Sequence, residues 1–255
     1  MRLSKARVEQ APELRGRCAF FLDVDGTLLD IADHPGLIRA DGDLVRLLKA
    51  LARAAQGALA LISGRPIADI DRLIPDSGFC IAGQHGAERR DFSGTMHRRE
   101  VPRAALEEAR RRLAAIAAKH PALVLEDKGV NFALHFRAVP GLGAEARDAV
   151  RGLAHDLGGE FEVQLGKMVV ELRPTGKDKG VAISEYLAEA PFHGRTPVFV
   201  GDDLTDETGF ELINRTGGHS VKVGEGESAA RWRLPDSAAV RAWLADFAAR
   251  SGGSA

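Results

Sequence analysis

The chain has 255 residues, of which 45% are hydrophobic, with 35 Lys and Arg against 36 Asp and Glu. This composition is typical of a soluble globular protein and excludes a disordered tail or a low-complexity array. The net charge of −1 and the 5% of aromatic residues argue against nucleic acid as a partner, because that binding needs a basic face or a base-stacking platform.

The cysteines and the N-terminal segment indicate the compartment in which the protein works. Cys18 and Cys80 each lie in a short apolar run, which predicts two buried core residues, and two cysteines are too few for a disulfide framework. Residues 1–17 are polar and lack the apolar segment of a signal peptide. No stretch approaches the ~18 uninterrupted apolar residues of a membrane span. We therefore expect a cytoplasmic protein with no membrane partner.

The first part of the chain alternates short apolar runs with helical periodicity. Continuous apolar runs at 18–24, 58–62 and 79–82 predict buried strands, and the segments between them carry apolar residues at helical spacing. Alternation of strand and helix, with strands that are apolar throughout, is typical of a parallel sheet that is covered on both faces.

The pattern changes between about residues 95 and 173. Helical spacing of apolar residues at 106–116 and at 146–157 is followed in each case by a pair of short strands, near 130–137 and 161–172. These strands alternate apolar and polar residues, so one face of their sheet is buried and the other is open. The order α-β-β-α-β-β predicts helices on one side of an antiparallel sheet.

Beyond residue 174 the strand and helix pattern resumes, with a strand at 197–200 and a closing helix that carries apolar residues at 240–247. The predicted fold is therefore α/β, a doubly wound parallel-sheet (Rossmann-like) core with an inserted αββαββ α+β cap domain. We predict the core at 1–94 and 174–255 and the inserted cap at 95–173.

The run Asp23-Val24-Asp25-Gly26-Thr27 follows the first predicted strand, at the sheet edge where open α/β folds place their sites. Both carboxylates can reach one reacting centre, because residues two apart on an extended chain project to the same side. Ionised Asp23 needs no activating base to attack a phosphate ester, while Asp25 could protonate the leaving oxygen and later accept a proton from water. Gly26 allows backbone N–H groups to approach phosphate oxygens. Taken alone, the run is equally compatible with a surface turn.

Three further segments strengthen the phosphoryl-transfer interpretation. Ser63 follows the second predicted strand, so its hydroxyl and the neighbouring amides could hold a phosphoryl oxygen. Lys179 opens a helix, where a cation is unfavourable to the helix dipole and so indicates a role other than stability. The segment 201–207 carries four acidic residues after a buried strand, and dense carboxylate oxygens suit magnesium. Each segment alone is also compatible with an ordinary turn, surface lysine or charged cap, but together they predict one phosphoryl-transfer site.

These motifs resemble, in this order, those of the haloacid-dehalogenase superfamily: DVDGTL, SGR, the Lys-Gly of DKG, and GDDLTDE. More narrowly, the sequence is similar to the trehalose-6-phosphate phosphatase family, in GQHGAE at 83–88, VVELRPTGKDKG at 169–180 and the GDDxTDE form of the acidic segment. The resemblance spans about residues 19–223. It implies magnesium-dependent hydrolysis of trehalose 6-phosphate through an aspartyl-phosphate, in trehalose biosynthesis.

The resemblance also implies a role for individual positions in the predicted core. Asp23 would be the nucleophile and Asp25 the general acid/base, with Ser63 and Lys179 stabilising the phosphate and the aspartyl-phosphate. The magnesium ligands would be the Asp23 carboxylate, the Asp25 backbone carbonyl and Asp202, with Asp203 and Asp206 orienting this metal shell.

For the sugar distal to the phosphate, the matching cap positions are Glu126, Lys128 and Glu171. The strand alternation independently places them on the open face, although ordinary solvated strand residues would have the same pattern. Further substrate-binding candidates are Gly26, Arg65, Gln84 and His85, where a histidine in a glycine-flanked turn could also be structural. The remaining histidines, which include His135, show no ligand spacing, and no function is assigned to them.

Two other functions stay open at this point. A phosphatase for another sugar phosphate, such as sucrose phosphate or mannosyl-phosphoglycerate, usually carries a different acidic segment. A non-catalytic sugar-phosphate sensor would have no need of the full set Asp23, Asp25, Lys179 and Asp202. The expected partner is a small-molecule sugar phosphate, and we expect a monomer that pairs functionally with a trehalose-6-phosphate synthase.

Overall fold

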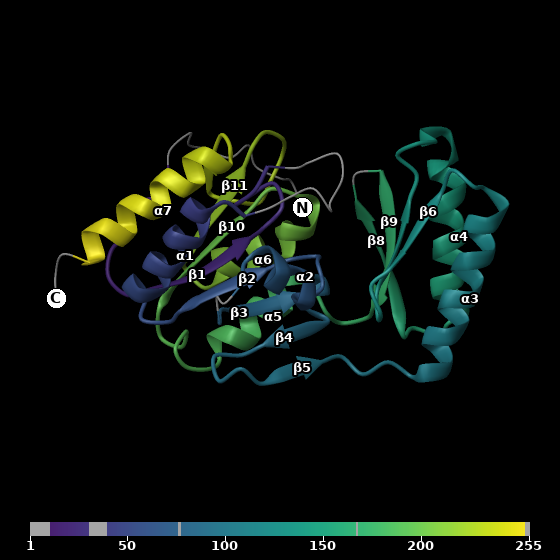
Figure 1. The fold of residues 1–255 in the computed structure, drawn as a ribbon, viewed down its shortest axis with the longest axis horizontal. Helices are drawn as coiled ribbons and strands as arrows, with labels where there is room; N and C mark the ends of the chain where they lie inside the picture. Colours follow the sequence, from purple (N-terminus) through teal and green to yellow (C-terminus); the bar gives the residue numbers. More distant parts are fainter. Residues whose placement is uncertain (1–10, 31–39, 76–77, 167, 253–255) are drawn as a thin grey trace. The chain divides into compact units, whose positions relative to one another are not determined.

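The computed structural model describes residues 11–30, 40–75, 78–166 and 168–252. The chain divides into two compact units, one of residues 1–97 and 178–255 and the other of residues 98–177 (Figure 1). Within the described residues, no helix has both the length and the apolar character needed to cross a membrane.

The first unit is organised around one sheet, in which eight strands of the described chain follow the order β12-β11-β10-β1-β2-β3-β4-β5. The strands from β12 to β3 are parallel, which confirms the predicted parallel α/β core. Their bounds are β1 Cys18–Asp23, β2 Leu59–Ile62, β3 Cys80–Gly83, β10 Thr196–Gly201, β11 His219–Val223 and β12 Trp232–Leu234.

The edge of this sheet differs from a purely parallel arrangement. Strand β4 (Glu88–Arg90) pairs antiparallel with β3, and β5 (Met96–Arg98) is the edge strand. Both are short, β4 has no apolar residue, and every residue of β5 is exposed, so apolar periodicity could not reveal them.

Helices pack on the parallel sheet in two pairs, α1 with α7 and α5 with α6 (Figure 1). Every residue of β1 is buried, and Phe20 and Phe21 pack against Phe247 and Phe192, with ring centroids 4.9 and 5.4 Å apart. Burial of side chains of this size contributes about 1.5–3 kcal/mol each, so β1 is firmly held and its carboxyl end is fixed in place. The helix bounds are α1 Gly42–Ala54, α2 Ile67–Leu73, α5 Lys179–Leu187, α6 Glu207–Arg215 and α7 Ser237–Gly252.

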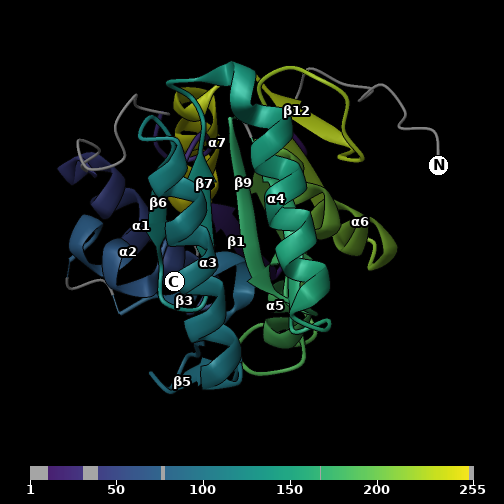
Figure 2. The ribbon, with the colours of Figure 1, turned by 90° about the vertical axis from the view of Figure 1, so that its right-hand side faces the viewer.

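The second unit has its own sheet and its own apolar core. Four strands of its described residues pair antiparallel in the order β6-β7-β9-β8, and helices α3 and α4 lie on one side of them (Figure 2). The buried side chains between sheet and helices include Leu113, Phe132, Leu134, Val150 and Leu172. In chain order the elements are α3 Arg103–Lys119, β6 Val124–Asp127, β7 Phe132–His135, α4 Gly143–Asp156, β8 Phe161–Gly166 and β9 Val169–Pro174.

Candidate active site

A buried lysine lies between two aspartates at the carboxyl end of β1. The Nζ of Lys179 is 2.7 Å from Asp23 Oδ1 and 2.7 Å from Asp206 Oδ1, and all three side chains are almost completely buried. Lys179 is the first residue of α5, whose N-cap Asp178 accepts a hydrogen bond from the Val181 amide. The tertiary fold therefore brings together residues 156 positions apart, because the N-terminus of α5 meets the end of β1.

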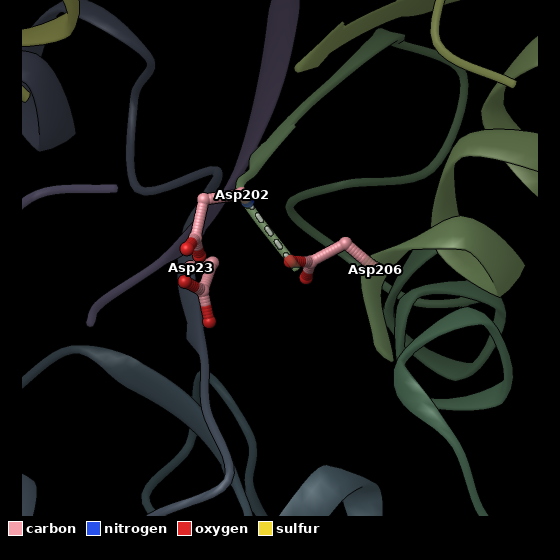
Figure 3. A group of neighbouring side chains, drawn as sticks. All are labelled: Asp23, Asp202 and Asp206. Atoms are coloured by element: carbon pink, nitrogen blue, oxygen red, sulfur yellow. Dashed lines mark hydrogen bonds between the residues drawn. The ribbon is translucent and has the colours of Figure 1, made fainter. Parts of the chain in front are cut away.

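The acidic segment after β10 is shaped by its own carboxylates. Asp206 Oδ2 accepts hydrogen bonds from the backbone N–H groups of Asp202 and Asp203, at 3.0 and 2.9 Å; Figure 3 shows the first of these. The Asp203 carboxylate caps the short helix η4 (Leu204–Asp206) by accepting from the Leu204 amide at 2.6 Å. Asp203 is exposed and Asp206 is completely buried, so the two residues predicted to orient a metal shell have different environments.

Gly26 allows the Asp202 carboxylate to approach β1 closely. Its φ is +82°, a region that L side chains rarely adopt, and a Cβ at this position would overlap the Asp202 carboxylate. That Gly26 lets phosphate oxygens approach the backbone stays a prediction; the structure shows that the glycine also makes room for an acidic side chain.

Asp23, Asp202 and Asp206 each offer a carboxylate oxygen within 4.8 Å of the others (Figure 3). Hard oxygen ligands of this kind suit a divalent cation, so these residues could hold one. Both oxygens of Asp206 already accept hydrogen bonds from Lys179 and from the loop backbone. Asp23 and Asp202 are therefore the better candidate ligands, and Asp206 is better suited to hold the loop and the lysine.

Burial and charge shift the pKa values of these groups. Burial raises the pKa of Asp23 well above its ordinary value, against the opposing charge of Lys179. Burial and the Asp206 charge raise the pKa of Asp202 to about 6. Burial alone would lower the pKa of Lys179, but the charges of Asp206 and Asp23 outweigh it and raise the pKa. The lysine is therefore a permanent cation, and additional positive charge would favour the ionised carboxylates.

Arg65 forms a bidentate ion pair with Asp25. Its Nε lies 2.7 Å from Asp25 Oδ2 and its Nη2 lies 2.7 Å from Asp25 Oδ1. The sequence predicted Arg65 as a substrate ligand, which stays a prediction, and the structure joins it to the predicted general acid/base. The two side chains are partly buried, which strengthens such a charge-assisted pair relative to one on the surface.

The loop after β2 and the turn after β3 lie against each other. Ser63 is buried, and its Oγ accepts from the Arg65 amide at 3.1 Å. The His85 amide donates to the Ser63 carbonyl at 2.9 Å and the Gln84 amide to the Arg65 carbonyl at 2.9 Å. Gln84 and His85 have φ values of +49° and +55°, a strained backbone that surrounding structure must maintain. The His85 ring packs where Gly64 has no side chain, so both residues adjoin the Ser63 loop.

Lys222 is a functional candidate that the sequence analysis missed. Its side chain is buried. On β11 it lies opposite Gly201 of β10, and its ammonium group donates a hydrogen bond to the Asp202 backbone carbonyl. The only signal in the sequence that could have pointed to it is a lysine between two valines in the segment His219–Val223, which forms β11.

In the second unit, the three predicted sugar-binding residues form a cluster in which Lys128 lies between the carboxylates of Glu126 and Glu171. Lys128 Nζ is 2.9 Å from Glu171 Oε1 and 3.9 Å from Glu126 Oε2. Glu171 and Lys128 are largely buried, whereas the Glu126 side chain is 44% exposed. His135 joins them, because its Nε2 is 2.9 Å from Glu126 Oε2.

The chain is similar to known proteins over most of its length. The family model for trehalose-phosphatase matches residues 21–238. The trehalose-6-phosphate phosphatase of Escherichia coli (strain K12) is 44% identical over 238 residues, which is 92% of this chain and 88% of that protein.

Solved structures give the same result at the level of the fold. A trehalose-6-phosphate phosphatase related protein aligns with a TM-score of 0.78 and 27% identity, over 93% of this chain and 100% of that one. A haloacid dehalogenase-like hydrolase from Bacteroides thetaiotaomicron aligns with a TM-score of 0.64 and 18% identity, over 91% of this chain and 100% of that one, and supports the fold alone. The chain therefore belongs to the trehalose-phosphatase family and has a haloacid-dehalogenase-like fold.

Proposed function

We propose that this chain hydrolyses trehalose 6-phosphate to trehalose and inorganic phosphate through an aspartyl-phosphate, with Mg²⁺ as its metal ion. The observation that carries the proposal is the buried Lys179 bridging Asp23 and Asp206 at the end of β1, beside Asp202 and Asp25. The E. coli relative's name supports the choice of substrate, and the family model supports a phosphatase.

In the first half of the reaction, an Asp23 carboxylate oxygen forms a bond to phosphorus while the bond from phosphorus to the sugar oxygen breaks. Asp25 gives its proton to that leaving oxygen, so that trehalose departs as a neutral alcohol. In the second half, water attacks phosphorus and the bond to Asp23 breaks. Asp25 takes the proton from the water, which restores both carboxyl groups and releases phosphate. The net reaction consumes one water per phosphate.

Charge neutralisation accounts for most of the catalysis in this type of phosphoryl transfer. Lys179 is held as a cation within hydrogen-bond distance of Asp23, and the Ser63 hydroxyl would hold a phosphoryl oxygen. Asp23, the Asp25 backbone carbonyl and Asp202 would hold Mg²⁺, with Asp206 orienting the loop. When bound, this ion supplies positive charge that favours ionised Asp23 and neutralises the phosphoryl oxygens.

The second unit would act as a cap that recognises the sugar. Glu126, Lys128 and Glu171 carry charged donors and acceptors on the open face of its sheet, and such groups suit the many hydroxyls of a disaccharide. Their mutual ion pairs support a preformed recognition surface, because side chains already held in place lose less freedom on binding.

The test is phosphate release from trehalose 6-phosphate, sucrose 6-phosphate, glucose 6-phosphate and p-nitrophenyl phosphate, each with Mg²⁺ and with a chelator. We expect a strong Mg²⁺-dependent preference for trehalose 6-phosphate. Asp23→Asn should abolish turnover while it leaves substrate binding measurable, and the exposed Asp43→Asn on α1 serves as the matched control. Preference for another sugar phosphate would keep the core chemistry and reject the sugar assignment. Inactivity on every substrate would favour a sugar-phosphate sensor.

A further inference from the structure

The open face of the second sheet brings together residues from three strands in one row. The register pairs Glu126 on β6 with Ala133 on β7, and Ala133 in turn with Glu171 on β9. Two positions along β7 from Ala133, His135 pairs with Val124. His135 is therefore a diagonal neighbour of Glu126 on the same face, a spacing that long side chains can bridge.

The side chains use this spacing. His135 Nε2 is 2.9 Å from Glu126 Oε2, and Lys128 Nζ approaches the same oxygen at 3.9 Å. Because a carboxylate only accepts hydrogen bonds, the imidazole must be the donor. Glu126 Oε2 is thus held from two sides, and Oε1 is the oxygen that remains oriented for another donor.

Glu126 is more exposed than its neighbours, so the contacts to its Oε2 matter for its orientation. Its side chain is 44% exposed, whereas Lys128 and Glu171 are only 11% and 10% exposed. The hydrogen bond from His135 and the charge of Lys128 lower the pKa of Glu126 despite the opposing effect of burial. Glu126 is therefore an ionised acceptor, and because it is more exposed than Glu171 it depends more on a partner for a single orientation.

We propose that His135 is a positioning residue for sugar recognition: it donates to Glu126 Oε2 and thereby orients Oε1 to accept a hydrogen bond from a hydroxyl group of the sugar. The inference rests on the proposed function, because Glu126 must contact the sugar for its orientation to matter. His135 acts through Glu126 and has no part in the phosphoryl-transfer chemistry, which belongs to residues of the first unit.

The experiment compares His135→Ala, which removes the donor, with His135→Gln, which keeps an N–H donor, in the full chain with Mg²⁺. Both are assayed on trehalose 6-phosphate and on p-nitrophenyl phosphate, which has no sugar. The exposed His155→Ala on α4 is the matched control, and thermal melting confirms that each variant is folded.

We expect His135→Ala to raise the KM for trehalose 6-phosphate roughly fivefold to tenfold, as for a side chain that must be immobilised on binding, with kcat changed less than about twofold. His135→Gln should restore most of the affinity, and kcat/KM for p-nitrophenyl phosphate should stay at the wild-type value. The double variant His135→Ala/Glu126→Gln should have the same KM as Glu126→Gln alone, because the two residues act as one unit.

An unchanged KM in His135→Ala would overturn the proposal, and so would additive effects in the double variant, which would give His135 a contact of its own. An unchanged KM in Glu126→Gln would also overturn it, since nothing would then be positioned. These outcomes are separate from failure of the proposed function, which would appear as a wild-type protein that releases no phosphate from trehalose 6-phosphate; that result would reject both.

Discussion

The Arg65 guanidinium binds both carboxylate oxygens of Asp25, through Nε to Oδ2 and Nη2 to Oδ1, each at 2.7 Å. A fork-to-fork pair of this kind fixes the orientation of the carboxyl group. Arg65 therefore holds Asp25, the proposed general acid/base, in one orientation.

Replacement of Arg65 should affect substrates according to their leaving groups. We expect Arg65→Met to lower kcat/KM for trehalose 6-phosphate on the order of tenfold or more, because an alkoxide leaves poorly without a positioned acid. The loss for p-nitrophenyl phosphate, whose leaving group needs no proton, should stay below about threefold. Steady-state kinetics on both substrates makes the comparison, with the exposed Arg72→Met on α2 as control. Equal losses on both substrates would instead indicate that Arg65 binds the phosphoryl group.

Substitution of Gly26 tests the close approach of Asp202. We expect Gly26→Ala to lower activity on the order of 100-fold and to weaken Mg²⁺ dependence, because the new Cβ overlaps the Asp202 carboxylate and the Asp25 to Thr27 backbone must shift. Gly16→Ala is the matched control: Gly16 also has positive φ, +70°, but a Cβ there meets no described atom within 4 Å. It should cost only backbone strain, about 1–2 kcal/mol, and keep full activity. Similar activity in the two variants would contradict the steric explanation.

Asp206 is expected to be essential to the stability of the site. Asp206→Asn places an amide NH₂ group against either the Lys179 ammonium or the two loop N–H groups that Asp206 now accepts from. Loss of one partner from a buried pair costs about 3–5 kcal/mol. Urea unfolding should therefore show a decrease of that order in the free energy of unfolding, and a phosphatase assay should show loss of activity. Asp203→Asn should keep stability within about 0.5 kcal/mol, since asparagine caps helices as well as aspartate does. Equal destabilisation by the two variants would argue against this assignment.

The raised pKa of Asp202, about 6, predicts how the stability of metal-free protein depends on pH. The unfolded value is about 3.9, so between these values the folded protein binds the proton more readily than the unfolded one. The stability that protonated Asp202 contributes is present at low pH and is lost as pH rises through about 6. In chelator, wild type should therefore gain stability relative to Asp202→Asn as pH falls from 7 to 5. Urea unfolding at both pH values measures this difference, and a constant difference would contradict the shift.

The positions of the buried strands and the identity of the acidic motifs could be predicted from the sequence. Strand β1 is apolar throughout and ends at Asp23, and parallel strands place their carboxyl ends at one edge. That argument predicted that Asp23 and Asp202 would lie in one region, and the structure brings their carboxylates together. The strained turn at Gln84 and His85 could only be noted as a motif, because local preference gives no sign of two adjacent residues with positive φ.

What the sequence by itself determined, then, is the alternation that builds a parallel sheet and the chemistry available where its strands end. Only the tertiary structure decided which side chains are partners: Arg65 with Asp25 across 40 residues, Lys222 with the Asp202 carbonyl, and His135 with Glu126. The short strands β4 and β5 were likewise visible only in the fold. The physical reason is that periodicity records which face of an element is buried, whereas a hydrogen bond or ion pair depends on atoms that converge within about 3 Å from elements far apart in the chain.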